Sequence, residues 1–188
     1  MTAASIRACR DARAAHWQLG PLPPDRGRLT LLAWTGSPGT VDSGVPGEIA
    51  GVLARSWTSI ARVTFPSSLT GATRIVSTRD RDAVVRAFDD PAFPWWMQGQ
   101  VLLLSEPDRD PPAVDEPGLR ALLEEDWART ATALEGRGVN GVVRPGVDGD
   151  VAGLLALSDP FDGRMMQTLE REARLAGLAW SLVPESAL

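Results

Sequence analysis

The segment VNGVVRPGVDGDVAGLLAL, residues 139–157, decides how the fold is interpreted. It contains two apolar runs, at 139–143 and 151–157, and both are rich in valine or leucine. Between them lies RPGVDGD, in which Asp148 and Gly149 form a dipeptide typical of a tight turn. The segment therefore predicts a β-hairpin.

The segments on either side of this hairpin alternate between helix and strand. On the N-terminal side, a stripe of leucines predicts a helix over 118–135, and an apolar strand over 100–104 precedes it. On the C-terminal side, a helix over 160–175 begins after Asp159 with a proline, and a strand over 178–183 follows. The order βαββαβ predicts a ferredoxin-like half, an antiparallel sheet with two helices on one face.

The preceding part of the chain repeats this alternation. Its predicted elements are a central strand over 29–34, a helix over 49–60, short strands over 62–65 and 74–77, and a helix near 78–88. Four apolar helix positions recur 70 residues later: Ile49, Val52, Leu53 and Trp57 return as Leu119, Leu122, Leu123 and Trp127. This echo indicates a weak internal duplication.

These elements predict one α/β (α+β) domain over residues 1–188, with helices packed on a mixed or antiparallel sheet. An N-terminal helix over 3–17 and a Pro/Gly-rich connector occupy residues 1–27. The first half of the domain covers 28–104 and the second covers 105–188.

Composition limits the possible functions. The 188 residues are 44% hydrophobic, which is enough for a buried core. No apolar run is long enough to span a membrane, and the N-terminus lacks the apolar segment of a secretory signal. The single cysteine favours a reducing compartment, so we expect a cytoplasmic protein. The net charge of −5 disfavours nucleic acid as a partner.

Missing residue types exclude several reaction mechanisms. The chain has no lysine and no tyrosine, and all 19 of its basic residues are arginine. Schiff-base chemistry, a pyridoxal phosphate anchor and a phosphate-loop lysine are therefore excluded. The lone histidine, His16, excludes a two-histidine metal site. No cofactor is predicted, and catalysis is not the preferred hypothesis.

The most unusual local feature is an aromatic segment followed by an acidic, proline-rich loop. Side chains alternate along an extended chain, so Trp95 and Trp96 cannot both face one side of a sheet. An exposed aromatic pair is typical of a protein-binding surface. The predicted surface combines this segment with acidic residues of loop 105–118. Its residues are Phe93, Trp95, Trp96, Met97, Asp108, Asp110, Asp115 and Glu116.

A second group of residues predicts a ligand-binding alternative. Loop 35–47 connects a strand to a helix, and its backbone N–H groups and hydroxyls are suited to an anion. Asp159 and Asp162 follow one predicted strand, and Asp108 follows another. Carboxylates gathered at one sheet edge are suited to Mg²⁺. The residues of this alternative site are Gly36, Ser37, Asp42, Ser43 and Asp159, with the carboxylates of loop 105–118.

Three functional hypotheses follow from these features. The leading one is a non-enzymatic binding protein whose acidic, Trp-bearing surface recognises a basic protein partner. An inhibitor of the immunity or antitoxin kind, or a chaperone, would fit the size and charge of the chain. The first alternative is a small-molecule enzyme or ligand-binding regulator with a carboxylate site. The second is a structural homo-oligomer. Cys9 lies near Arg7, Arg10 and Arg13, whose positive charges would lower the pKa of its thiol. A reactive thiol is therefore a further, less favoured hypothesis.

Overall fold

The computed structural model describes residues 4–12, 24–35, 45–67, 74–89, 101–109, 122, 127–145 and 150–188. The strands in these ranges are β1 (Ser5–Arg10), β2 (Arg28–Thr35), β3 (Arg62–Ser67), β4 (Arg74–Thr78), β5 (Leu102–Ser105), β6 (Val139–Pro145), β7 (Val151–Ala156) and β8 (Ala179–Leu182). The α-helices are α1 (Gly47–Ile60), α2 (Arg81–Asp89), α4 (Trp127–Leu134) and α5 (Asp159–Leu175). Two short 3₁₀ helices, η2 (Pro24–Arg26) and η3 (Glu185–Ala187), complete the described elements.

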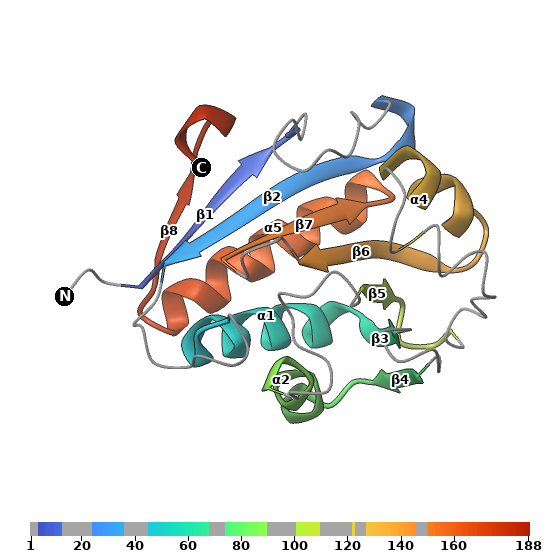
Figure 1. The fold of residues 1–188 in the computed structure, drawn as a ribbon, viewed down its shortest axis with the longest axis horizontal. Helices are drawn as coiled ribbons and strands as arrows, with labels where there is room; N and C mark the ends of the chain where they lie inside the picture. The colour runs from blue at the N-terminus through green and yellow to red at the C-terminus, as the bar shows by residue number, and fades with distance from the viewer. Residues whose placement is uncertain are drawn as a thin grey trace.

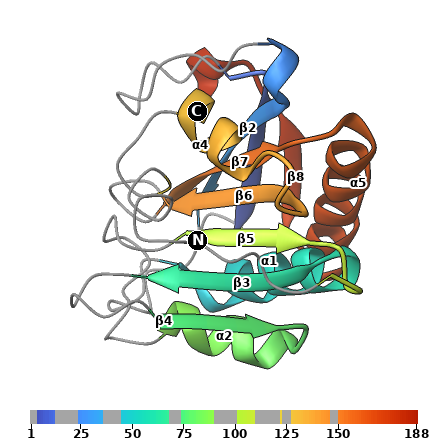
Figure 2. The same cartoon turned by 90° about the vertical axis from the view of Figure 1, so that its right-hand side faces the viewer.

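All eight strands join one mixed sheet in the order β4-β3-β5-β6-β7-β2-β1-β8. Neighbouring strands are antiparallel except for β1 and β8, which run parallel. Figure 2 shows this alternation of direction from β6 through β5 and β3 to β4. The fold is therefore of the α+β class, with β4 at one edge of the sheet and β8 at the other (Figure 1).

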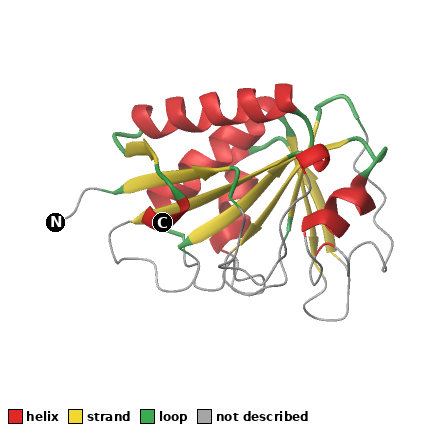
Figure 3. Ribbon diagram, turned by 90° about the horizontal axis from the view of Figure 1, so that it is seen from above, coloured by secondary structure: helices red, strands yellow, loops and turns green. Residues whose placement is uncertain are grey.

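The helices cover the two faces of the sheet unequally. Helices α1, α2 and α5 contribute to the larger hydrophobic core, on what we call the α5 face of the sheet. Figure 3 shows the longer helices stacked along one side of the strands. Helix α4 packs on the opposite face, the α4 face, through Trp127, Ala131 and Leu134. The strands thus supply alternate residues to two cores, as Leu102 and Leu103 illustrate.

Two glycines in the central strands each make room for one aromatic side chain, one in each core. A Cβ atom on Gly141 of β6 would lie 2.6 Å from Cε1 of Phe161, on the α5 face. A Cβ atom on Gly153 of β7 would lie 2.4 Å from Cζ2 of Trp127, on the α4 face. Both rings therefore rest directly on the sheet backbone.

The predicted hairpin and most of the strands are confirmed. β6 and β7 pair in antiparallel register, with Val142 opposite Leu155. The helix predicted over 118–135 contains α4, and Leu122 is helical as well. The remaining positions of its first half, including Leu119 and Leu123, lie outside the described residues.

The N-terminal helix predicted over 3–17 is wrong where the structure describes it, because residues 5–10 form strand β1. Alanine and arginine favour helices locally, but tertiary pairing overrides this preference. β1 lies between β2 and β8 and pairs with both. Residues 13–17, with His16, lie outside the described residues.

The ferredoxin-like arrangement and the internal duplication are not confirmed. The second half has the chain order β5-α4-β6-β7-α5-β8, but α4 and α5 cover opposite faces of the sheet. The two halves also interleave, since β2 pairs with β7. The two tryptophans at equivalent positions of the predicted duplication lie in different cores. Trp57 is buried on the α5 face and Trp127 on the α4 face.

A glycine-dependent turn leads from α5 into the edge strand β8. Gly177 has a φ of +74°, and its N–H donates to the carbonyl of Arg174. The N–H of Leu178 donates to the carbonyl of Ala173, which completes a Schellman motif. Leu178 is buried, and this anchors the start of β8 beside β1.

Candidate binding surfaces

Of the residues assigned to the two predicted binding sites, Asp108 and Asp159 lie in the described part of the chain. The other predicted residues lie outside it, so their surfaces remain predictions. They are Phe93, Trp95, Trp96, Met97, Asp110, Asp115 and Glu116 of the aromatic and acidic surface, and Gly36, Ser37, Asp42 and Ser43 of loop 35–47.

The segments that follow β5 and β7 leave the sheet on the same side, at the C-terminal ends of these two strands. Both strands are antiparallel to β6, which lies between them, so they run parallel to each other. Glu106 follows β5 and forms an ion pair of 2.7 Å with Arg164 of α5. The Oδ1 atom of Asn140 accepts a hydrogen bond of 3.1 Å from the backbone N–H of Glu106. These contacts hold the two segments together.

The described carboxylates at this edge do not converge on one point. The Asp108 side chain is 97% exposed and lies 3.6 Å from the Arg79 guanidinium. Asp159 is exposed in the first turn of α5. Among the residues that the structure describes, no three His, Cys, Asp or Glu side chains are placed to hold a metal ion.

The buried carboxylate of Asp162 instead forms an ionic cluster with partly exposed arginines from the paired strands β1 and β2. It lies in the first turns of α5, and its side chain is 3% exposed. Its Oδ2 atom contacts a guanidinium nitrogen of Arg10 and lies 3.5 Å from Nη1 of Arg28. Arg28 also lies 3.0 Å from Asp11, whose backbone has a φ of +53°. The cluster ties the start of α5 to the ends of two strands.

Burial and the neighbouring arginines have opposite effects on the pKa of the Asp162 carboxyl. Burial raises the pKa of the Asp162 carboxyl, because removal from water disfavours its charged form. Arg10 and Arg28 lower this pKa, but they do not cancel the effect of burial. Asp162 was noted in the sequence only as half of an acid pair. Its burial could have been predicted from its place among Phe161, Met165 and Met166 on the apolar stripe of the helix.

No strand among the described residues pairs with the outer edge of β8. Ala179 donates its N–H to the carbonyl of Ala4, and Val183 donates to that of Ala8. In a parallel strand pair, alternate residues direct their backbone groups to the same side, so Trp180 and Leu182 direct theirs away from β1. The Leu182 side chain is 63% exposed, and β8 contains no charged residue and no proline. Edge strands usually carry such protective residues.

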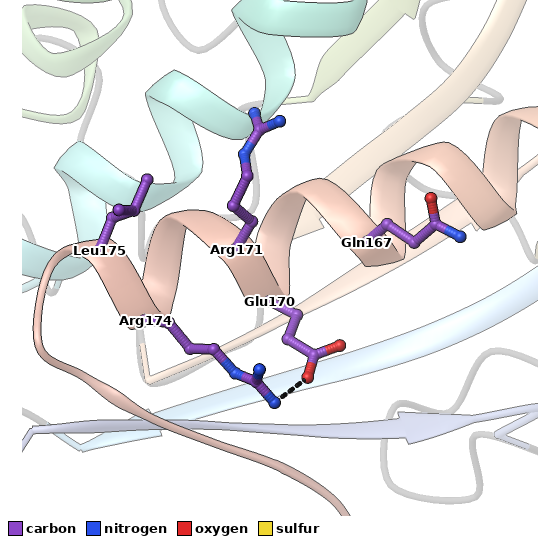
Figure 4. A pocket seen from close by; sticks show the side chains of 5 residues that line it. All are labelled: Gln167, Glu170, Arg171, Arg174 and Leu175. Carbon is purple, nitrogen blue, oxygen red and sulfur yellow. Dashed lines mark hydrogen bonds and ion pairs between the residues drawn. The ribbon is translucent and has the colours of Figure 1, made fainter.

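A shallow pocket of about 400 Å³ lies over the outer side of α5 (Figure 4). Its lining residues are Gln167, Glu170, Arg171, Arg174 and Leu175. Arg174 pairs with Glu170 at 2.5 Å, and Arg171 points to the other side of the helix, toward α1. Arg171 and Arg55 of α1 both pair with Glu172, at 3.0 and 2.9 Å. Both arginines of this pocket are therefore paired, Arg174 with Glu170 and Arg171 with a Glu172 carboxylate that it shares with Arg55.

The expectation that arginines activate Cys9 is wrong. Cys9 lies on β1 and is buried with Ala12, Leu31 and Leu188 on the α4 face of the sheet. Burial raises the pKa of its thiol, and the charges of Glu185 and Asp11 raise it further. A thiol with a raised pKa is a poor nucleophile at neutral pH.

Within the described part of the chain, no helix combines the length and the apolar content that spanning a bilayer requires. Comparison of the chain with protein families, curated proteins and solved structures found no match.

Proposed function

We propose that this chain is a cytoplasmic, non-enzymatic binding protein that takes an extended segment of a partner protein onto the open edge of β8. The single observation that carries this proposal is the outward direction of the backbone groups of Trp180 and Leu182. Strand addition at a sheet edge is a common mode of peptide recognition, in which backbone hydrogen bonds provide the affinity.

The groups on β8 define what the partner segment must offer. Two N–H and two C=O groups, from Trp180 and Leu182, match the spacing of an extended strand. The side chains of both residues lie on the α5 face, because they are in register with Ile6 and Ala8 of β1. A partner segment with apolar side chains on that face would cover Leu182, which is 63% exposed.

Composition supports binding over catalysis as the function. The full chain lacks lysine and tyrosine and has one histidine, which leaves few side chains for acid–base or covalent chemistry. Its net charge of −5 and the acidic residues of 105–118 favour a basic partner. The aromatic segment with Trp95 and Trp96 would then supply a second contact to the same partner.

The test is affinity purification from the native host with three forms of the protein, wild type, Leu182→Pro and Leu182→Ser. Proline removes the outward N–H at position 182 but leaves the hydrogen bonds to β1, and serine keeps that N–H while removing the leucine. We expect a partner that wild type retains, that the serine variant retains more weakly and that the proline variant loses. Identical partner lists for wild type and a folded proline variant would refute the role of β8.

Two further measurements separate this proposal from its alternatives. A Trp95→Ala/Trp96→Ala variant tests the aromatic segment, and its loss of a partner that Leu182→Pro keeps would move the binding surface to residues 93–97. Sedimentation of the purified protein tests homo-oligomerisation. If wild type self-associates and Leu182→Pro does not, the segment on β8 comes from a second copy of the chain.

One observation favours the ligand-binding alternative, the common edge at which the segments after β5 and β7 leave the sheet. Residues Asp110 and 111–118 follow β5 in the chain, so their carboxylates remain candidates for this edge. Thermal-shift screening against nucleotides, divalent metals and small metabolites tests this function. A ligand present at 100 times its Kd is expected to stabilise the fold by about 2.7 kcal/mol.

A further inference from the structure

The outward backbone groups of β8 are arranged so that the strand can pair with a second copy of itself. Trp180 and Leu182 direct their N–H and C=O groups away from β1, and Ser181 between them directs its groups toward β1. A two-fold axis beside Ser181, perpendicular to the sheet, would bring Trp180 of each copy opposite Leu182 of the other. Both are then hydrogen-bonded pairs of an antiparallel ladder, and each exchanges two backbone hydrogen bonds.

This register is the antiparallel one that uses every outward group of the strand. A shift toward the start of β8 would pair Leu182 with Leu178, whose N–H is already donated to Ala173 in the turn after α5. A shift in the other direction would pair Trp180 with Pro184, which has no N–H to donate. The two ends of β8 therefore select the register centred on residue 181.

The same register covers an apolar side chain that the single chain exposes. Trp180 packs partly buried against the core of the α5 face, and Leu182 shares that face but is 63% exposed. Side chains directly opposite each other in an antiparallel pair have Cβ atoms about 5 Å apart, so each leucine would lie against the indole of the other copy. β8 contains no charged residue, so the pairing sets no like charges opposite each other.

The described neighbours of β8 leave its outer edge accessible. After Pro184 the chain turns onto the α4 face, where Leu188 packs beside Cys9 of β1. The Ala187 carbonyl accepts a hydrogen bond from the Arg7 guanidinium, which also belongs to β1. The C-terminal residues therefore lean over β1, on the side of β8 away from the open edge.

We infer that, without its partner protein, the chain forms a two-fold symmetric dimer in which β8 pairs with β8 of a second copy. The inference rests on the open edge of the proposed function and adds its regulation, because the partner segment and the second copy compete for the same backbone groups. The strand contributes four residues from each chain. Stable interfaces use about 20–30 residues a side, so this dimer is weak and readily displaced.

Cysteine crosslinking tests the register directly. In this dimer the two copies of residue 181 form a non-hydrogen-bonded pair with Cα atoms about 4.5 Å apart, within the range that a disulfide spans. Ser181→Cys should therefore give a covalent dimer under mild oxidation. The matched control is Ala179→Cys, which is exposed on the same face of β8 but lies about 13 Å along the strand from its copy. We expect it to stay monomeric like wild type, whose Cys9 is buried.

Equal crosslinking of the two variants, or no covalent dimer from Ser181→Cys, would overturn the inference. Combining Leu182→Pro with Ser181→Cys removes the outward N–H of residue 182 from both copies, so crosslinking should fall severalfold. Undiminished crosslinking in a folded double variant would also refute the pairing.

These results are separable from the test of the proposed function. Loss of a partner protein by Leu182→Pro, with no covalent dimer from Ser181→Cys, would refute the dimer and leave the proposed function in place. A covalent dimer from Ser181→Cys, with identical partner lists for wild type and Leu182→Pro, would refute the proposed function and leave the dimer.

Discussion

Gly153→Ala is expected to destabilise the protein by pushing a buried tryptophan off the sheet. The new Cβ atom would lie 2.4 Å from Cζ2 and 2.8 Å from Cη2 of Trp127. Carbon atoms pack at about 3.5–4.0 Å, so the ring would have to move by about 1 Å. Trp127 is buried, and a close-packed core offers it no free space.

The magnitude follows from two opposing effects. Overpacking of a core costs about 1–3 kcal/mol. Replacing glycine also restricts the unfolded chain, which returns about 0.4–1 kcal/mol of stability. We expect a net loss of about 1–2 kcal/mol in the free energy of unfolding, measured by urea denaturation, and a fall in Tm of about 2–8 °C.

A set of matched variants shows whether Trp127 is the cause. Gly141→Ala places its Cβ atom 2.6 Å from Cε1 of Phe161 on the opposite face. It therefore tests the same kind of clash with a different aromatic ring. Gly163→Ala on α5 meets no atom within 4 Å and is expected to stabilise the protein by about 0.5–1 kcal/mol.

Double-mutant cycles then identify the clashing partner. Trp127→Leu should relieve Gly153→Ala by about 1–2 kcal/mol and leave Gly141→Ala unchanged, because contacting residues couple and distant ones do not. Phe161→Leu should show the reverse pattern. Relief of Gly153→Ala by Phe161→Leu, or no coupling to Trp127→Leu, would refute the assignment of α4 and α5 to opposite faces.

Three further predictions concern the turn before β8, the ionic cluster and the buried thiol. Gly177→Ala should cost about 1–2 kcal/mol in urea denaturation, because its φ of +74° is strained for alanine; no loss would contradict the Schellman motif. The raised pKa of Asp162 means that the folded state binds its proton more tightly, so this carboxyl's stabilisation is complete below the unfolded pKa of about 3.8 and is lost as pH rises through the folded value. The stability of wild type relative to Asp162→Asn should therefore fall as pH rises above about 3.8, and a rise would show that the arginines dominate. Cys9 should resist a thiol reagent in the native protein and react after unfolding, and rapid native labelling would contradict its burial.

Elements with a strong local pattern could be predicted from the sequence. Leu29 to Trp34 is almost wholly apolar, and it forms part of the buried strand β2. The apolar spacing of Ile49, Val52 and Trp57 identified α1, whose buried residues include all three. In these segments local preference and tertiary packing agree, so periodicity is sufficient.

The rest depended on contacts between distant segments. Nothing local in SIRACR distinguishes a strand from a helix, and its pairing with β2 and β8 determines the outcome. The ionic cluster joins Arg10 and Arg28 to Asp162, which lies more than 130 residues further along the chain. Strand order determines such sites, and spacing along a sequence does not reveal it.

The parallel pairing of residues 5–8 with 179–182 also has a consequence for biosynthesis. At about 5–20 residues per second, a ribosome delivers β8 about 10–35 s after β1. During that interval the outer backbone groups of β1 lack their native partner, so the nascent chain exposes a strand edge to other emerging polypeptides. Folding of this flank of the sheet therefore waits until residues 179–182 have been synthesised, and it is the step at which a molecular chaperone would have most effect.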